Sequence, residues 1–424
     1  MDKNDHTDML DSGLNFAFPG VVKSSQSSII KVIGVGGGGD NAVNYMYRQG
    51  IHDVSYVVCN TDQKALDASP VPNKLLFGDG LGAGNNPEIG REKAEESIEE
   101  IKNMLNDGTR MVFITAGMGG GTGTGAAAVV AEIAKSCNAL TVAVVTTPFT
   151  FEGKKKLSLA EQGIEKLRKS VDTLIIIPNQ HLLNVVEQNT PIKKAFLLAD
   201  SALLQAVQGI SDLITEPGEI NIDFADVKTV MKGKGDALIG LGFGEGTNRA
   251  VEAAKQSINN PLLENASIEG AKAVLVNIAG GDNLTLQEYQ DVVELITANV
   301  DEEALITAGQ SYNPALGERI RVTVVATGFE HRSVSTGANA AEIFGTNKNG
   351  KGEGETVEQN VYPRKIEENS VRKEAPREKE SPKDPGVISI NRWTDLKNQL
   401  NLRSNNNSDY TTPSILRMRN DDDQ

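Results

Sequence analysis

The feature that most constrains the fold is a run of glycine and threonine at residues 119–125 (GGGTGTG). The run follows an apolar segment, residues 111–116, that is typical of a buried strand, and it precedes a helical segment, residues 126–136. Glycine lets a backbone approach a ligand closely, and free N–H groups at the start of a helix attract anions. We therefore predict a strand–loop–helix unit whose loop binds phosphate. It is not a P-loop, because G-x-x-x-x-G-K-[ST] occurs nowhere in the chain.

A second glycine-rich run, residues 34–39 (GVGGGG), stands near the start of the chain. It ends a predicted strand at residues 29–35 and opens an amphipathic segment at residues 41–49. The run matches the G-x-G-x-x-G pattern of dinucleotide-binding proteins, so an NAD-binding Rossmann oxidoreductase is one interpretation. That interpretation leaves the run at 119–125 unexplained. A purely structural turn would need only one or two glycines.

Apolar and helical segments alternate along the first half of the chain, which predicts a parallel sheet covered by helices on both faces. One long helix follows at residues 193–215, and Pro217-Gly218 ends it. Asn86 and Pro87 mark a helix start. Further predicted strands are residues 54–60, 140–147 and 173–178, and the predicted helices are residues 86–107 and 158–170.

The alternation resumes after residue 217 and predicts a second, smaller α/β domain. We place the first domain at residues 29–215 and the second at 216–330. In the second domain the predicted strands are residues 237–241, 273–278, 304–308 and 319–327, and the predicted helices are residues 224–232, 248–257 and 285–298.

Both ends of the chain differ in composition from the centre. Residues 1–28 are polar and predict a flexible arm, and residues 331–410 hold too few apolar side chains to fold, which predicts a disordered linker. Residues 411–424 contain an apolar patch (PSILRM, 413–418) that predicts docking to a partner. A second apolar patch around Trp393 (387–393) suggests no role of its own.

The net charge of −15 lies in residues 1–330, which hold 27 basic and 42 acidic residues. An acidic body repels nucleic acid and anionic lipid, so neither is predicted as a partner. Phosphate must then be held by backbone N–H groups and a metal ion.

Cysteine, histidine and hydropathy indicate a cytoplasmic protein without a metal centre of its own. Cys59 and Cys137 lie in apolar segments and resemble buried thiols of a reducing compartment, and the four histidines show no metal-site spacing. No apolar run approaches the roughly 20 residues that span a bilayer, and the first ten residues are too polar for a signal peptide.

The glycine runs belong to a longer series of motifs that resembles the tubulin/FtsZ family of GTPases. The resemblance covers residues 29–329, with the motifs in the family's order and spacing. It implies a tubulin-like fold with a Rossmann-type GTP-binding domain, a long core helix and a smaller C-terminal activation domain. The motifs are GVGGGGDNAVN (34–44), NTD (60–62), GAGNN (82–86), PFTFEGKKK (148–156), IPN (177–179), AVQGISDLI (206–214), NIDFADVKTVM (221–231) and RVTVVATG (321–328).

The resemblance implies a role for individual residues in binding GTP or GDP, with Mg²⁺ accompanying the nucleotide. The Asp200 carboxylate would accept the N1–H and 2-amino donors of guanine and repel N1 of adenine, which favours GTP over ATP. Phe196 would stack on the base. The implied contacts are Gly37, Gly38, Gly39, Asp40, Asn41, Ala83, Gly84, Gly121, Thr122 and Gly123 near the phosphates, Glu152 and Lys156 at the ribose, and Asn179, Phe196 and Asp200 at the base.

Two of these positions depart from the commoner family pattern. Asp40 stands where glycine is frequent, and its charge would repel phosphate unless the side chain points away or helps to bind Mg²⁺. Lys156 stands where arginine is usual and replaces a bidentate fork with a point charge. Both differences concern nucleotide affinity.

Asn221, Asp223 and Asp226 admit two interpretations. The two acids could cap the helix at 224–232 and complement its dipole. The resemblance implies instead that this segment reaches the nucleotide of the next subunit, where the acids polarise the attacking water and Asn221 helps to place it. One residue can serve both roles.

The resemblance also implies a function. It implies a GTPase that assembles head-to-tail into filaments of the bacterial division ring, in the cytoplasm at mid-cell, with each active site shared between neighbouring subunits. Residues 411–424 resemble the family's adaptor-binding peptide, with Ile415 where phenylalanine is typical, so membrane adaptors and division proteins are the implied partners. A relative that binds GTP without hydrolysing it is the alternative, and the acids at 221–226 argue against it.

Overall fold

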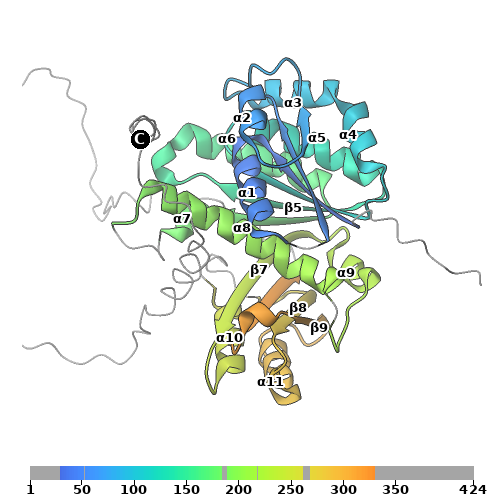
Figure 1. Ribbon diagram of the computed structural model, residues 1–424, viewed down its shortest axis with the longest axis vertical. Coiled ribbons are helices and arrows are strands. Elements are labelled where there is room, and N and C mark those ends of the chain that lie inside the picture. Colours follow the sequence, from blue (N-terminus) through green and yellow to red (C-terminus); the bar gives the residue numbers. More distant parts are fainter. Residues whose placement is uncertain (1–28, 52, 184–188, 217, 261–267, 330–424) are drawn as a thin grey trace, which may run out of the picture. The chain divides into compact units, whose positions relative to one another are not determined.

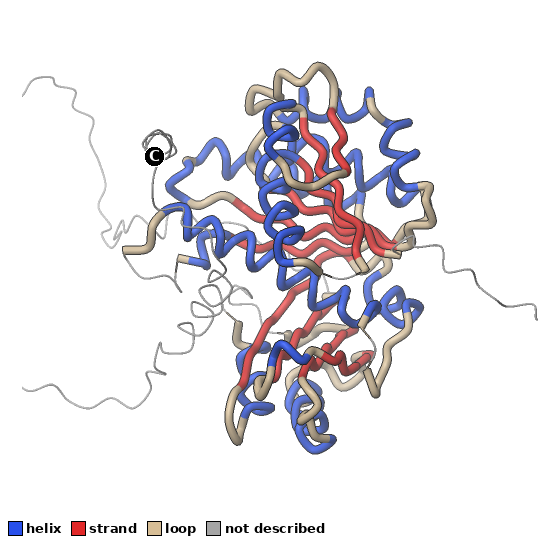
Figure 2. Tube along the Cα trace, viewed as in Figure 1, coloured by secondary structure: helices blue, strands red, loops and turns tan. Residues whose placement is uncertain are grey.

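A single sheet of ten strands organises the protein. The computed structural model describes residues 29–51, 53–183, 189–216, 218–260 and 268–329, and the three predicted tail segments lie outside them. The strand order is β3-β2-β1-β4-β5-β6-β7-β10-β8-β9. Figures 1 and 2 show helices on both sides of this sheet.

The first six strands in the chain pair in parallel, as the alternating pattern predicts. Their residues are nearly all buried, because helices cover both faces. The strand β3 is short and partly exposed, and the sequence analysis missed it. These strands are β1 (Ile30–Val35), β2 (Val54–Asn60), β3 (Asn73–Leu76), β4 (Met111–Gly117), β5 (Leu140–Thr147) and β6 (Thr173–Pro178).

Two hydrophobic cores lie on opposite faces of this parallel sheet. One core contains side chains of α1 (Gly36–Gln49), α2 (Gln63–Ala68) and the long helix α8 (Ile192–Thr215). The other core contains side chains of α4 (Ile98–Leu105), α5 (Thr122–Ser136) and α6 (Lys154–Ser170), with Ala94 of α3 (Pro87–Glu96).

The helix predicted at residues 86–107 is in fact two helices. The backbone of Ser97 has φ −104° and ψ 22°, which interrupts the helical path between α3 and α4. The predicted start is confirmed, because the Asn86 side chain accepts a hydrogen bond from the Glu88 N–H and Pro87 occupies the first helical position.

The sheet continues into the C-terminal domain without a break. Thr173 of β6 pairs in parallel with Gly235 of β7, and β10 then runs antiparallel between β7 and β8. A third core lies between these strands and two helices. The elements are α9 (Phe224–Met231), β7 (Gly235–Gly244), α10 (Arg249–Ile258), β8 (Ala273–Gly280), α11 (Leu286–Thr297), β9 (Leu305–Tyr312) and β10 (Ile320–Thr327).

The helix α8 joins the two domains. Asp212 of α8 forms a buried ion pair with Arg321 of β10, and the Asn277 side chain donates to the Gly209 carbonyl. By length and composition α8 would also suffice to cross a membrane, which the search for apolar runs did not detect. Because 67% of the relevant window is buried inside the protein, a core helix accounts for it and the membrane signal is weak.

Candidate functional site

The two glycine runs meet where the strand order reverses. The chain leaves β1 toward β2 on one side, whereas β4 lies on the other side of β1. In open parallel sheets, ligands bind beyond the carboxyl ends of the strands at such a point. Residues 36–39 follow β1 and residues 118–125 follow β4, so both runs stand at this edge.

Both glycine runs form helix starts instead of preceding them. The helix α1 begins at Gly36 and α5 begins at Thr122, earlier than the predicted starts at residues 41 and 126. Neither helix has a capping side chain, so the N–H groups of both first turns are left for a ligand. The sequence analysis placed these starts late because glycine is a poor helix former.

Glycine is required here because the two runs pack on each other. A Cβ on Gly36 would lie 2.6 Å from the Gly123 nitrogen, and one on Gly39 would lie 2.2 Å from the Thr115 oxygen. A Cβ on Gly37 or Gly120 would meet no atom within 4 Å. Some glycines therefore permit close packing, and others line open space that a phosphate can occupy.

A third loop, Gly82–Gly84, joins the first two. A Cβ on Gly121 would lie 2.9 Å from the Ala83 Cβ, so the predicted contacts Ala83 and Gly84 do stand beside the second run. The Gly82 N–H donates to the Thr61 carbonyl (2.8 Å), and the hydroxyls of Thr61 and Thr122 are 2.6 Å apart. Fully buried Thr61 thus connects two of the predicted phosphate-binding loops. The NTD motif was the signal for it, although the sequence analysis gave it no role.

Asp40 points away from the open side of the loop. Its side chain is 3% exposed, and Oδ2 accepts a hydrogen bond from the Asn60 amide (2.6 Å). Burial, opposed by this bond and one from the Cys59 backbone, raises the pKa of Asp40 to about 8. Near neutral pH the group is therefore mostly an uncharged acid, which removes the expected repulsion of phosphate.

The predicted base-binding residues gather at the carboxyl end of β6 and on α8. Asn179 begins α7 (Asn179–Leu182), and its buried Oδ1 accepts no hydrogen bond within the described part of the chain. Burial raises the pKa of Asp200 to about 7. Phe196 is 41% exposed, and its ring meets Phe149 edge-to-face at 5.4 Å. The exposed Phe196 ring offers a surface on which a base can stack, and Asn179 Oδ1 and the Asp200 carboxylate offer two acceptors. This combination suits a purine that supplies N–H groups, as guanine does.

Tyr45 also belongs to this end of the site. It lies on α1, its hydroxyl forms a hydrogen bond with Ser201, and burial, with the Asp200 charge nearby, raises its pKa. The sequence analysis missed it. The available signal was its position four residues after Asn41, which places both on one face of α1.

The predicted ribose residues pair with each other. Lys156 Nζ lies 3.0 Å from Glu152 Oε2, while Glu152 Oε1 accepts the Phe149 N–H at 3.0 Å. Glu152 ends a short 3-10 turn (Thr150–Glu152), and Lys156 lies in the first turn of α6. Lys156 therefore neutralises Glu152, but unlike arginine it cannot at the same time offer a ligand a second N–H donor group in a fixed geometry.

The segment that carries Asn221, Asp223 and Asp226 (residues 218–226, here called the acidic segment) lies at the opposite ends of the strands. Arg110, which directly precedes β4, stacks over the Phe224 ring at 4.7 Å, and the Thr173 hydroxyl at the start of β6 donates to the Met231 carbonyl. Both contacts place α9 at the amino ends of the strands. Because the seven residues of β4 span about 20 Å, α9 cannot reach the phosphate loops of its own chain.

The three predicted catalytic residues are exposed on this segment but differ in their contacts. Asp223 is the N-cap of α9 and accepts the Asp226 N–H (2.9 Å), so its predicted capping role is confirmed. The Asn221 amide is bonded to both backbone groups of Gly218 (2.9 and 2.7 Å). The Asp226 carboxylate has no hydrogen bond or ion pair among the described residues, so it is the acid left free to act.

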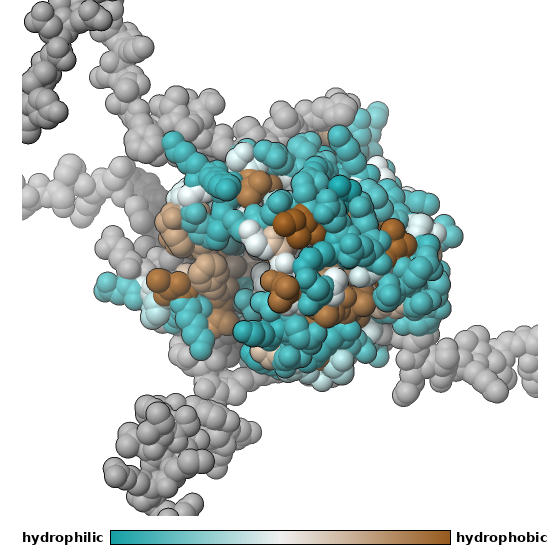
Figure 3. All heavy atoms as spheres, turned by 90° about the horizontal axis from the view of Figure 1, so that it is seen from above, coloured by the Kyte–Doolittle hydropathy of each residue, from teal (hydrophilic) through white to brown (hydrophobic). Residues whose placement is uncertain are grey.

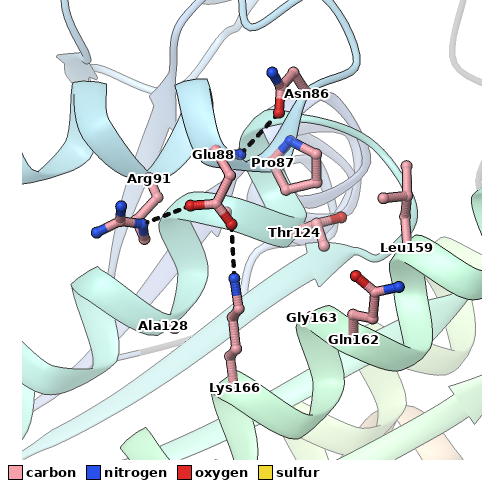
Figure 4. A pocket seen from close by; sticks show the side chains of 11 residues that line it. Asn86, Pro87, Glu88, Arg91, Thr124, Ala128, Leu159, Gln162, Gly163 and Lys166 are labelled. Atoms are coloured by element: carbon pink, nitrogen blue, oxygen red, sulfur yellow. Dashed lines mark hydrogen bonds and ion pairs between the residues drawn. The ribbon is translucent and has the colours of Figure 1, made fainter.

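A separate cavity of about 160 Å³ lies between α3, α5 and α6 (Figure 4). Glu88 crosses it and pairs with Arg91 (3.0 Å) and with Lys166 of α6 (2.8 Å). Thr124 and Gly125, at the end of the second glycine run, line it, but none of the individually predicted nucleotide contacts does. Its charged groups already pair with one another, so its role is to tie α3 to α6.

Comparison with known proteins identifies the family. Residues 29–187 match the GTPase domain of the Tubulin/FtsZ family, and residues 235–330 match the C-terminal domain of the FtsZ family. A solved FtsZ from M. jannaschii, described as an empty dimer, is 45% identical with a TM-score of 0.68, over 71% of this chain and 88% of that one. The chain belongs to the tubulin/FtsZ family of GTPases. A point mutant of that FtsZ matches equally well, at 45% identity, TM-score 0.67 and coverages of 71% and 91%.

Two less similar solved structures come from Haloferax volcanii. CetZ1, described as a GDP-bound monomer, is 20% identical with a TM-score of 0.63, over 72% of this chain and 96% of that one. CetZ2, described as a GTPγS-bound protofilament, is 20% identical with a TM-score of 0.59, over 72% and 94%. At this identity the likeness concerns the fold alone, and it confirms the predicted tubulin-like architecture.

Proposed function

We propose that the protein is a GTPase that assembles head-to-tail and hydrolyses GTP at a site shared by two neighbouring subunits. The observation that carries the proposal is the separation of the two halves of the site. The phosphate loops follow the carboxyl ends of β1 and β4, whereas Asp226 lies beyond the amino ends of the strands. Asp226 can therefore reach the phosphates only of a second copy of the chain.

GTP is the nucleotide that the base-binding residues favour. The acceptors Asn179 Oδ1 and the Asp200 carboxylate would receive the guanine N–H donors, and Phe196 would cover the ring. The described residues contain no cluster of three or more His, Cys, Asp or Glu side chains able to hold a metal ion. Mg²⁺ would therefore be held mainly by phosphate oxygens and water, which is its usual mode with nucleotides.

Self-association is supported by the relatives and by the surface. The M. jannaschii FtsZ is described as a dimer, and CetZ2 as a protofilament. Leu81, which directly precedes Gly82, is 85% exposed, and Phe151, which directly precedes Glu152, is 67% exposed. Figure 3 shows apolar patches among hydrophilic side chains on one face. A contact between unlike faces produces an open filament when the rotation between successive subunits does not close into a ring.

In the shared site, Asp226 would accept a proton from the attacking water as a general base. The N–H groups of the two first helical turns would stabilise charge that develops on the phosphate oxygens. Asp223 would hold the start of α9 and so fix the place of Asp226.

The decisive test is GTP turnover per molecule as a function of protein concentration. A shared site requires assembly, so the turnover per subunit should vanish below a critical concentration and rise to a plateau above it. GDP binding to the monomer should persist at the lowest concentrations and serves as the control for folding. A turnover per molecule that stays constant on dilution would exclude the shared site.

We further propose that the filaments form the division ring of a bacterial cell, in the cytoplasm at mid-cell, and that residues 411–424 bind membrane adaptors and division proteins. These residues lie outside the described part of the chain. Deleting 411–424 should leave GTP turnover and polymerisation unchanged and abolish pelleting with adaptor-coated vesicles. If the truncated chain fails to polymerise, the docking role is wrong.

A further inference from the structure

The segment that carries Asn221 and Asp223 lies beside an edge strand. The strand β9 is the last of the ten-stranded sheet, so one side of it has no strand partner. On that side the Gln310 N–H donates to the Ile220 carbonyl (2.9 Å). The Gln310 side-chain oxygen accepts the Glu219 N–H (2.8 Å). A single residue of β9 thus holds backbone groups of two successive residues, Glu219 and Ile220, in the segment that precedes α9.

Small residues make this contact close. A Cβ on Gly218 would lie 1.9 Å from the Gln310 carbonyl oxygen, and one on Gly309 would lie 2.7 Å from the Ile222 side chain. Ile222 is 7% exposed and packs in the core that contains side chains of α1, α2 and α8. Residues 218–222 therefore lie directly on β9, although they form neither helix nor strand.

We propose that Gln310 is a positioning residue for hydrolysis, which sets the path of residues 218–223 and thereby the reach of Asp226 toward the neighbouring subunit's nucleotide. The inference rests on the proposed shared site. The backbone bond to Ile220 fixes one point of the segment, and the side-chain bond to Glu219 fixes a second, so together they prevent the segment from turning about β9. Asp223 then begins α9 from a fixed start.

The side-chain bond is the part that a substitution can remove. Without a side-chain acceptor at position 310, the exposed Glu219 N–H would donate to water instead. The segment would then be held to residue 310 only by the backbone hydrogen bond to Ile220. Displacing a reacting group by about 1 Å can cost on the order of 100-fold in rate. A partial loosening of this kind should lower turnover by roughly tenfold.

The experiment compares Gln310→Met, which has similar length and no comparable acceptor, with Gln310→Glu, which keeps an acceptor oxygen. Amide hydrogen exchange of residues 218–223 in the full chain reports positioning directly, and GTP turnover per assembled subunit reports its consequence. We expect faster exchange and lower kcat in the methionine variant, with unchanged GDP affinity and filament yield. In the glutamate variant both the exchange rate and kcat should equal those of the wild type. If Gln310 contributed only to stability, retaining the acceptor oxygen would not by itself preserve both values.

Mixing distinguishes which subunit carries the defect. Gly123→Asp subunits, which lack nucleotide but keep their acids, should support hydrolysis by Gln310→Met subunits, because the defect travels with the acids. If hydrogen exchange is unchanged in the methionine variant, Gln310 does not position the segment. If exchange is faster but GTP turnover is normal, the position of the segment does not control hydrolysis. A wild type without GTP turnover would overturn the proposed function, while exchange still decides whether Gln310 holds the segment.

Discussion

Asp226→Ala subunits are expected to bind GTP as the wild type does and to hydrolyse it roughly 10²–10⁴-fold more slowly, the range associated with loss of a general base. The substitution lies far from the nucleotide of its own chain, beyond the amino ends of the strands. Its carboxylate makes no hydrogen bond or ion pair among the described residues, so its removal should leave α9 folded. The measurement is single-turnover hydrolysis at saturating protein, with GDP binding by the same samples.

Asp223→Asn is the matched control. Asparagine caps a helix as well as aspartate does, so α9 should remain intact while the charge is lost. A rate close to that of the wild type would identify Asp223 as a cap alone. Asp226→Ala subunits, which keep their nucleotide, and Gly123→Asp subunits, which keep their acids, should each be inactive alone and should hydrolyse GTP when mixed, because the acids of one then act on the nucleotide of the other. If the mixture stays as inactive as its two components, the acids act within their own chain.

Asp200→Asn is expected to abolish most of the preference for GTP over ATP. The asparagine amide would place an N–H group against the guanine donors, and the mispaired contact should cost a few kcal/mol, or roughly 10²-fold in relative affinity. Competition between GTP and ATP for the monomer measures the effect. Equal affinity of the wild type for both nucleotides would refute the assignment of the base pocket.

The pH dependence of GDP affinity tests the role of Asp200 independently. In the proposed site guanine would bind the ionised carboxylate. Burial raises the pKa of Asp200 to about 7, so at lower pH the group must first lose its proton. GDP affinity should therefore fall about tenfold per pH unit from pH 7 to pH 5 and level off above pH 7. Asp40, with a pKa of about 8, stays mostly protonated across this range. The asparagine variant should show no such slope.

The sequence predicts the strands well because buried parallel strands are continuous apolar runs. β2, β5 and β6 have the predicted bounds. It misses β3 and α2 because their segments, NKLL and QKALDA, are short and half polar. The continuous sheet was not predicted, since the pairing of β6 with β7 and of β10 with β8 joins segments far apart in the chain.

The candidate site divides in the same way. Glycine-rich loops and the residues of family motifs could be predicted because their chemistry is local. The burial of Asp40 against Asn60, the meeting of Thr61 with Thr122 and the contact of Gln310 with Glu219 could not, because each depends on elements brought together only in three dimensions.

In the proposed head-to-tail filament, the location of the phosphate loops and of Asp226 at opposite ends of the strands makes the two ends of the filament unequal. At one end the last subunit exposes a bound nucleotide that no neighbour can attack, and at the other an acid segment faces solvent with nothing to cleave. A filament then has one fewer working site than subunits, and its shortest active form is a dimer with a single site. The uncleaved nucleotide always lies at the same end, so the structure of a single subunit determines the polarity of the filament.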